Sequence, residues 1–382
     1  MSQALPKLGT TTRLVARAAG LTPERLVAAF REATLDDLPQ ICDLRRRVLG
    51  KLLTWDDSAY LKWRYRFGAT GPGRGPCFVV VDEGKLLGMV GSEQLTLWCD
   101  GERLDVPSLM DIMIEPSLDG TGLGVWLNLM LFDRFPLAIE IGANPNSLGL
   151  ITRLYHRLPN RKQYVAPLHW RRVLGRRMKS RVLAATTLPL DVLYKGWRAL
   201  RLRGLLKQWT HRPIERFDAS ADELFLNRLA PREIAVERSS EYLNWRLFGN
   251  PRVRYIVMGV YEGERLIGYW AAHLRKLPNG VRSVDLVDWL IEEAAGIAGL
   301  GRLLEHAVRW AESEQADYVS ITVLHQISER ILGKLGFLRR SHEYNTVGVH
   351  CTDKERWPLM LQAGRWYLTE CNTDTDGIAV AP

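Results

Sequence analysis

The sequence predicts a mixed α/β protein whose two halves follow the same plan. The first observation is the stretch 107–126, where a strand-like apolar run ends at Pro116 and a glycine-rich loop leads into a helix-like apolar run. The second is a similar stretch at 283–301. The third is the string Tyr-Leu-x-Trp-Arg, which occurs at 60–64 and again at 242–246.

The two copies correspond residue by residue. Asp111 corresponds to Asp288 and Gly122 to Gly299, an offset of 177 residues in each case. The two Tyr-Leu-x-Trp-Arg strings are offset by 182 residues, and an extra loop at 68–76 in the first half accounts for the difference. Each string precedes a strand pair that turns at Glu-Gly. Because the order is the same in both halves, we expect a tandem repeat in place of two unrelated domains that share a turn.

Length and composition indicate a protein of two ordinary globular domains. The chain has 382 residues, of which 46% are hydrophobic and 25% charged. It contains no apolar run of membrane-spanning length and no signal-peptide core at its start. Five scattered cysteines without a CxxC pair, and eight histidines without ligand spacing, argue against a disulfide framework and a metal site. We therefore expect a cytoplasmic protein.

The expected organisation has five segments. Residues 1–20 are a flexible start, 21–167 the first domain, 168–212 a basic helical linker, 213–370 the second domain and 371–382 a tail. Each domain is expected to have a central mixed, largely antiparallel sheet with flanking helices.

Positive charge is concentrated in the linker. The chain carries a net charge of +9, yet residues 168–212 hold twelve Lys and Arg and one acid, Asp191. Basic, leucine- and tryptophan-rich helices bind anionic membrane surfaces, which would place the protein peripherally at a membrane. A structural linker packed over the domains explains the same composition. Binding to nucleic acid or another anionic polymer is the least favoured interpretation, since recognition needs more than charge.

The glycine-rich loop predicts an anion site. A strand, a glycine loop and a helix N-terminus together direct backbone N–H groups and the helix dipole at a phosphate. The spacing does not fit the dinucleotide fingerprint G-x-G-x-x-G. In the first half the candidate binding residues are Asp119, Gly120, Thr121, Gly122, Leu123 and Gly124. In the second half they are Gly296, Gly299 and Gly301.

This loop resembles the pyrophosphate loop of the GNAT acyltransferases, whose pattern is approximately V-x-P-x-x-[QR]-G-x-G-[IL]-[GA]. The matching residues are Pro116, Gly120, Gly122, Leu123 and Gly124. Asp119 departs from the pattern, because it replaces a Gln or Arg that helps to hold the phosphates and brings a negative charge. The resemblance implies acetyl-CoA or another acyl-CoA as donor and a primary amine as acceptor, with no metal.

The resemblance also implies catalytic roles. In GNAT enzymes a Glu that accepts the amine proton often stands where Asp111 and Asp288 stand, and Glu115 is a secondary candidate, as is Glu292. Tyr155 matches a Tyr close to the CoA sulfur and would protonate the leaving thiolate. A charged residue at a strand edge or in the core explains each acid equally well.

The second half keeps less of the pattern, since Leu332 occupies the position of that tyrosine. We therefore expect the donor in the first half, while the second half shapes the acceptor site. The repeated Tyr-Leu-x-Trp-Arg string and the late string Trp366-Tyr-Leu-Thr369 resemble those of bacterial tandem GNAT proteins associated with polysaccharide biosynthesis. This resemblance implies an N-acetyltransferase acting on an amino sugar or a lipid-linked sugar. Two alternatives remain open: a Fem-type aminoacyl transferase, also a tandem GNAT-like fold, and a catalytically degenerate binding or scaffold protein.

Overall fold

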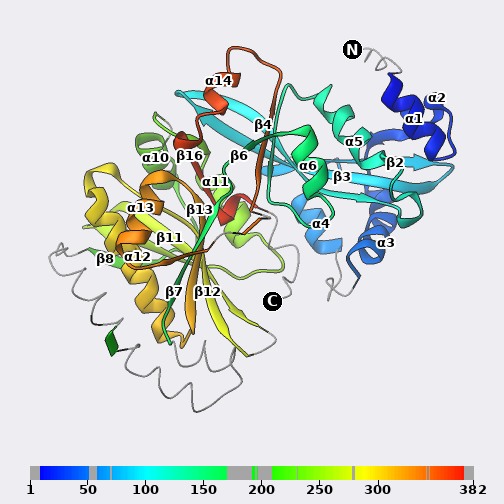
Figure 1. Ribbon diagram of the computed structural model, residues 1–382. Helices are drawn as coiled ribbons and strands as arrows, with labels where there is room; N and C mark the ends of the chain where they lie inside the picture. The colour runs from blue at the N-terminus through cyan, green and yellow to red at the C-terminus, as the bar shows by residue number, and fades with distance from the viewer. Residues whose placement is uncertain are drawn as a thin grey trace.

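The computed structural model describes residues 9–50, 58–68, 71–169, 192–193, 196, 209–229, 231–277, 280–340, 342–343 and 345–373. The described strands form one sixteen-stranded sheet system with helices on its outer faces (Figure 1). Most of the basic segment 168–212 lies outside the described residues, as does the tail beyond Thr373. None of the described helices is long and apolar enough to cross a membrane bilayer.

The first half contributes the following helices and short 3-10 turns: α1 (Thr10–Ala18), α2 (Pro23–Ala29), η1 (Leu35–Asp37), α3 (Leu38–Leu49), α4 (Ser58–Arg64), η3 (Pro116–Leu118), α5 (Leu123–Phe132) and α6 (Leu148–Leu154). Its strands are β1 (Phe30–Glu32), β2 (Gly73–Asp82), β3 (Lys85–Cys99), β4 (Glu102–Ile114), β5 (Leu137–Ile141), β6 (His156–Leu158) and β7 (Lys162–Pro167). Residues 10–18 lie within the start that we expected to be flexible, yet they form α1, and the Trp126 Nε1 of α5 donates to Thr12 Oγ1.

The second half contributes the following helices and turns: α10 (Ala219–Arg228), α11 (Ser240–Leu243), the π-helical turn η4 (Asn244–Phe248), η5 (Glu293–Ala295), α12 (Gly296–Ser313), α13 (Gln326–Lys334), α14 (Trp357–Met360), η6 (Ala363–Arg365) and η7 (Glu370–Asn372). Its strands are β8 (Thr210–Pro213), β9 (Ile234–Val236), β10 (Ile256–Glu262), β11 (Arg265–Lys276), β12 (Arg282–Ile291), β13 (Tyr318–Leu324), β14 (Leu338–Arg340), β15 (Val347–Cys351) and β16 (Trp366–Thr369). Strand β8 extends from the end of the basic segment and pairs with β10.

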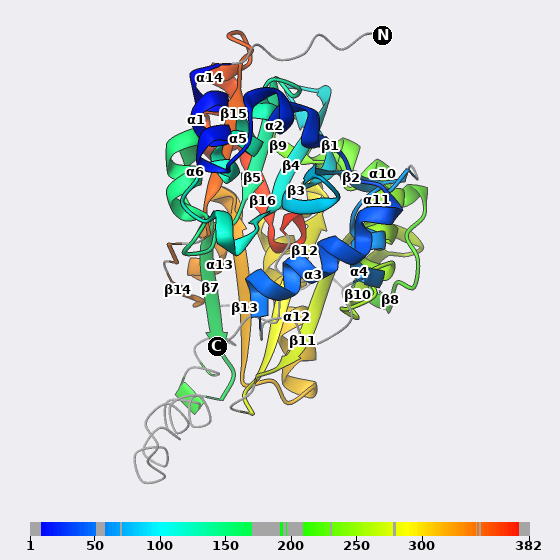
Figure 2. The same ribbon diagram turned by 90° about the vertical axis from the view of Figure 1, so that its right-hand side faces the viewer.

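The two halves exchange strands. β15, from late in the chain, pairs with β5 and β6 of the first half, so that Val347 lies opposite Ile141 and Leu158. β7, from the end of the first half, pairs with β13 and β14 of the second half, and Val165 lies opposite Ser320. Figure 2 shows β7 beside β13, and β15 among the helices of the first half. Neither sheet is therefore completed by its own half alone.

The hydrophobic core forms three layers. One cluster fills the space between α1, α2, α5, α6 and the first-half sheet. A second lies between α12, α13 and the second-half sheet. The third and central cluster contains residues of α3, α4, α10 and α11 together with inner faces of both sheets. Because this central cluster is shared, the halves are joined by core packing and not merely by a linker.

The repeated Tyr-Leu-x-Trp-Arg strings meet in this central cluster. The Trp63 and Trp245 rings stack at 4.9 Å between centroids and 20° between planes. Each indole Nε1 donates to the main-chain oxygen of the other tryptophan, both at 3.2 Å. Gly73 allows this packing, because a Cβ there would lie 2.1 Å from the Trp245 ring. Both tryptophans are therefore buried in the interior.

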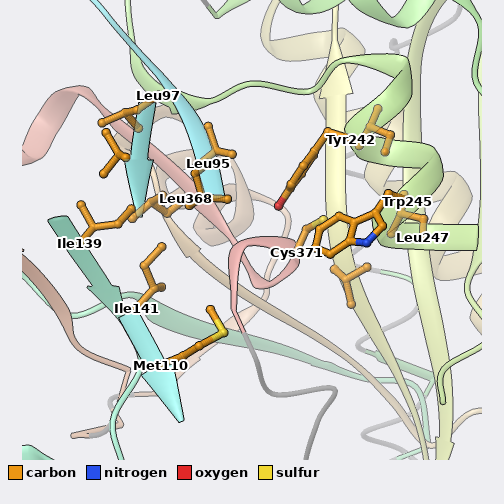
Figure 3. Packing of buried hydrophobic residues seen from close by; sticks show 14 of the residues in the cluster. Leu95, Leu97, Met110, Ile139, Ile141, Tyr242, Trp245, Leu247, Leu368 and Cys371 are labelled. Carbon is orange, nitrogen blue, oxygen red and sulfur yellow. The ribbon is translucent and has the colours of Figure 1, made fainter. Parts of the chain in front are cut away.

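The arginines of the two strings hold η7 between the halves. Arg246 Nε donates to Cys371 O at 2.8 Å, and its Nη2 donates to Thr373 O at 2.6 Å. Arg64 pairs with Glu93 at 3.0 Å and is completely buried. Figure 3 shows Cys371 between Met110 and Ile141 of the first half and Trp245 of the second. This short turn is therefore a structural link between the two sheets.

The strand exchange predicts that neither half folds alone. A fragment of residues 1–190 lacks β15, and a fragment of residues 191–382 lacks β7, so each would expose unpaired strand edges. We expect each fragment to be insoluble or unfolded by circular dichroism, whereas co-expressed fragments co-purify and unfold cooperatively like the intact chain. Cooperative unfolding of either fragment alone would contradict this prediction.

Candidate functional site

The glycine loop of the first half has the geometry of an anion site. Gly120 and Gly122 have φ values of +76° and +83°, a conformation that side-chain-bearing residues rarely adopt. Gly122 caps α5, and the backbone N–H groups of Gly122, Gly124 and Val125 have no acceptor among the described residues. These N–H groups lie at the positive end of the helix dipole, where a phosphate is stabilised.

Asp119 modifies this loop. Its Oδ1 accepts the Gly120 N–H at 2.9 Å, so one loop N–H is already bonded. Thr121 Oγ1 donates to Leu118 O at 2.7 Å and helps to hold the turn. A phosphate bound here would therefore accept hydrogen bonds from the N–H groups of Gly122, Gly124 and Val125. It would also lie near the Asp119 carboxylate.

The corresponding loop of the second half is built differently. α12 begins at Gly296, so Gly299 and Gly301 lie inside the helix and are buried. Trp209 covers this helical turn, since a Cβ on Gly299 would lie 3.0 Å from its ring. The Arg302 guanidinium lies 5.1 Å from the centre of the same ring. The indole therefore covers the turn of α12 that corresponds to the glycine loop of the first half.

Beside each loop, two parallel strands stop pairing. In the first half β4 and β5 are in register only at Ser108 and Ile139, although β4 continues to Ile114. In the second half β12 and β13 pair from Ser283 to Leu286, and β12 continues to Ile291. The unpaired ends of β4 and β12 therefore carry backbone groups that are not used by the neighbouring parallel strand.

Asp111 lies at a bulge in β4 and is held by two side chains. It has a φ of +52°, and the β3–β4 register shifts beside it. Arg45 Nη1 pairs with Asp111 Oδ2 at 2.6 Å, and the Tyr65 hydroxyl donates to the same oxygen at 2.5 Å. Gly91 makes room for the Tyr65 ring, which lies 2.2 Å from where a Cβ would be. Burial opposes ionisation, but Arg45 and the hydrogen bonds lower the pKa of Asp111 overall.

Asp288 has a similar environment in the second half. Arg238 Nη2 lies 3.2 Å from its Oδ1, Thr369 Oγ1 donates to the same oxygen at 2.8 Å, and the Tyr269 hydroxyl donates to Oδ2 at 2.7 Å. All of these side chains are buried. Each predicted acid is thus bound by an arginine and a tyrosine. These partners come from distant segments, and no spacing in the sequence identifies them.

Tyr155 is linked to the glycine loop. α6 ends before it, and its hydroxyl donates to Asn128 Oδ1 at 2.8 Å, while Asn128 Nδ2 donates to Gly124 O at 2.9 Å. Burial raises the pKa of Tyr155 well above its usual value, and the charge of Glu140 adds to this effect. The phenol is therefore protonated at neutral pH, and it joins α6 to the first turn of α5.

Glu115 and Glu292 occupy equivalent places at the ends of β4 and β12. Glu115 pairs with Arg47 at 2.7 Å, and Glu292 pairs with Arg265 at 2.5 Å. Asp111 and Glu115 both pair with arginines of α3. No group of three or more His, Cys, Asp or Glu side chains that could hold a metal is found among the described residues.

η7 lies next to both unpaired strand regions. Arg161 Nη1 donates to Glu370 Oε2 at 2.8 Å, and another nitrogen of the same guanidinium lies beside Gly142, directly after β5. Arg64 Nη2 lies 3.1 Å from Met110 Sδ on β4. No motif in residues 370–373 predicts that they lie here.

Comparisons with solved structures identify the fold. A GCN5-related N-acetyltransferase from Anabaena variabilis superposes with a TM-score of 0.57 at 13% identity, over 84% of this chain and 72% of that chain. Saccharomyces cerevisiae N-myristoyltransferase with bound myristoyl-CoA gives 0.54 at 12% identity, over 85% and 82% of the respective chains. A probable N-acyltransferase from Enterococcus faecalis gives 0.55 at 12% identity, over 88% and 73%.

No protein-family model matches the sequence, and no curated protein matches it in a sequence comparison. The structural likeness covers most of the chain. The expected fold class is confirmed: the chain has a mixed α/β, two-domain GNAT-like architecture.

The Asp111–Arg45 pair predicts a large effect on stability. Arg45→Met leaves a buried carboxylate without its cation, which costs about 3–5 kcal/mol of unfolding free energy. Because the folded-state pKa of Asp111 is lowered from 3.8, this difference is present at neutral pH and shrinks as the pH falls below that value. Urea unfolding at several pH values measures it.

Two matched variants complete this test. Arg46→Met removes an exposed pair with Asp43 on the same helix and should change stability by less than about 1 kcal/mol. Adding Asp111→Asn to Arg45→Met should recover much of the loss, since Asn carries no charge and tolerates positive φ. Equal effects of Arg45→Met and Arg46→Met would contradict a buried pair.

Proposed function

We propose that the protein is an acyl-CoA-dependent N-acyltransferase, an N-acetyltransferase in its simplest form, whose donor binds in the first half. The observation that carries this proposal is the glycine loop of α5, where three N–H groups lack an acceptor among the described residues. The loop adjoins the unpaired end of β4. Together they supply donors for a pyrophosphate and a thioester arm. Fold neighbours include an enzyme with bound myristoyl-CoA, which supports the choice of ligand.

The reaction requires three events. The acceptor nitrogen attacks the thioester carbon, so a C–N bond forms and the C–S bond breaks. The ammonium must first lose a proton, and the departing thiolate must gain one. Backbone N–H groups near the β4 bulge would polarise the thioester carbonyl. No metal is needed for any of these events.

We assign Asp111 a positioning role in this reaction. Its lowered pKa and its contacts with Arg45 and Tyr65 make it a weak proton acceptor at neutral pH. The same contacts fix the positive-φ residue of the bulge, and thereby the direction of the neighbouring N–H groups. Asp288, bound by Arg238 and Tyr269, would hold β12 beside the register shift between β11 and β12. Glu115, paired with an arginine at the end of β4, remains a candidate proton acceptor.

Tyr155 would act on the loop through Asn128. Its protonated hydroxyl orients the Asn128 amide, which in turn binds the Gly124 carbonyl. The alternative role, protonation of the thiolate, needs the phenol to leave Asn128 and reach the CoA sulfur.

The finer identity of the substrate is also a proposal. An amino sugar of a polysaccharide pathway is the acceptor that the resemblance to tandem GNAT proteins suggests, and the repeated plan of the halves supports a tandem origin. Contact of the basic segment with an anionic membrane would bring a lipid-linked acceptor close. A non-catalytic acyl-CoA-binding protein is the second candidate, because the carboxylates of both Asp111 and Asp288 are already bound by arginines.

The donor site is tested with two matched glycines. Gly120 and Gly101 have similar φ values, +76° and +78°, and a Cβ on either meets open space. Gly120→Glu places a negative charge on the loop and should weaken acetyl-CoA or longer acyl-CoA binding about tenfold or more in calorimetric titrations. Gly101→Glu carries the same backbone strain at a distant turn and should bind like the wild type.

The second-half loop is tested with Ile297→Glu, since Ile297 is exposed in the first turn of α12. We expect no change in acyl-CoA affinity. Loss of binding in Ile297→Glu alone would move the donor to the second half. An absence of acyl-CoA binding by the wild type would reject the proposed function, whereas binding without transfer to any amine would favour the non-catalytic candidate.

Tyr155→Phe separates the two roles of this residue. A positioning role predicts weaker acyl-CoA binding with little change in the dependence of kcat on pH. A proton-donor role predicts unchanged binding and a lower kcat, with loss of the basic limb of the pH profile. Calorimetry and thiol-release kinetics on the same variant distinguish them.

A further inference from the structure

One face of the second-half sheet carries polar side chains where an apolar face would be expected. α12 and α13 cover the opposite face, which is formed by residues such as Val284 and Leu286. The alternate positions of β12 carry Ser283 and Asp285. In register, Asp285 lies between His273 of β11 and Ser320 of β13.

Two of these polar atoms are buried without a partner. Ser283 is completely buried, and its Oγ has no hydrogen-bond partner among the described residues. Asp285 Oδ1 is also buried without one, while its other oxygen pairs with Arg275. Burying polar groups unpaired costs free energy, and such sites persist where a ligand supplies the missing bonds.

Glu370 brings a second carboxylate towards Asp285. η7 packs against β12, and the charge of Glu370 acts on Asp285. Burial first, and then this like charge, raise the pKa of Asp285 to about 6, although Arg275 opposes the shift. A cation between the two carboxylates would relieve both effects.

This region lies next to the proposed donor strands. Arg161 joins Glu370 to the end of β5, and Arg64 joins the neighbouring residue Thr373 to Met110 on β4. A group bound at Asp285 and Glu370 is therefore separated from the unpaired end of β4 by the short turn η7. The polar face of the second half and the donor strands of the first half adjoin the same turn.

We infer that Asp285, with Glu370 and Ser283, forms the subsite that binds the ammonium group of the acceptor. The inference rests on the proposed acyl transfer and names the chemical class that the second half recognises, a primary amine. The ionised Asp285 attracts the ammonium, and Ser283 Oγ accepts a hydrogen bond from one of the ammonium N–H groups. Asp285 can then accept the proton that the amine must lose before attack, because its carboxylate is a stronger base than an exposed one.

The test measures amine binding separately from acyl transfer. n-Hexylamine is titrated calorimetrically into the wild-type chain saturated with CoA, and n-hexanol serves as the uncharged control. We expect the amine to bind and the alcohol not to bind. Asp285→Asn should weaken amine binding about tenfold or more while leaving acetyl-CoA affinity unchanged. Glu262→Gln, an acid paired with Arg265 at the far end of the same sheet, should have no effect.

The pH dependence adds a second readout. The charged or titratable side chains around Asp285 are Arg275 and His273 on β11 and Glu370 on η7. Protonation of Asp285 removes its charge, so wild-type affinity for hexylammonium should fall as the pH is lowered from 7 to 5, about one unit either side of 6. Asp285→Asn should lose most of this dependence.

Three outcomes would overturn the inference: equal amine affinity in Asp285→Asn and wild type, equal binding of amine and alcohol, or no binding of n-hexylamine to the wild type. Failure of the proposed function has a different result, which is that the wild-type protein does not bind acetyl-CoA. Amine binding is therefore also measured on the protein without CoA.

Discussion

The exchange of β7 and β15 is the constraint on which the rest of the molecule depends. Each strand hydrogen-bonds in the sheet of the other half. The halves therefore cannot separate without breaking the ladders of β7 with β13 and β14 and those of β15 with β5 and β6. The stacked rings of Trp63 and Trp245 then fix the relative orientation of the halves. With both sheets held in this way, η7 has a defined place between β4 and β12, and the region where donor and acceptor are proposed to meet is preorganised.

Buried charge is distributed asymmetrically around this core. Asp111 and Asp288 are each bound by an arginine and a tyrosine within the protein. Asp285 has fewer hydrogen-bond partners. Its Oδ1 has none among the described residues, and the Glu370 carboxylate lies nearby. The partners of these acids distinguish Asp111 and Asp288, which are structural, from Asp285, which is a candidate binding group. Their positions in the sequence do not make this distinction as clearly.

Much of the fold could be predicted from the sequence, because local patterns determine it. The Thr22-Pro23 helix start, the Glu83-Gly84 turn and the glycine loop before α5 depend on residues close in the chain. The strand exchange could not be predicted, since β7 and β15 look like ordinary strands and their partners lie far away. The candidate site was predicted only in part for the same reason. Arg45, Arg238 and Asn128 come from other elements, and Trp209 lies at the edge of a segment read as a linker.

The late position of β15 has a consequence for synthesis of the chain. The first-half sheet has a gap between β5 and β6 until residues 347–351 have left the ribosome. Its apolar strands therefore remain incompletely paired until the chain has been synthesised through residue 351. Folding of the two halves is coupled in time as well as in space, and the nascent protein depends on late, long-range pairing that is slow and prone to aggregation.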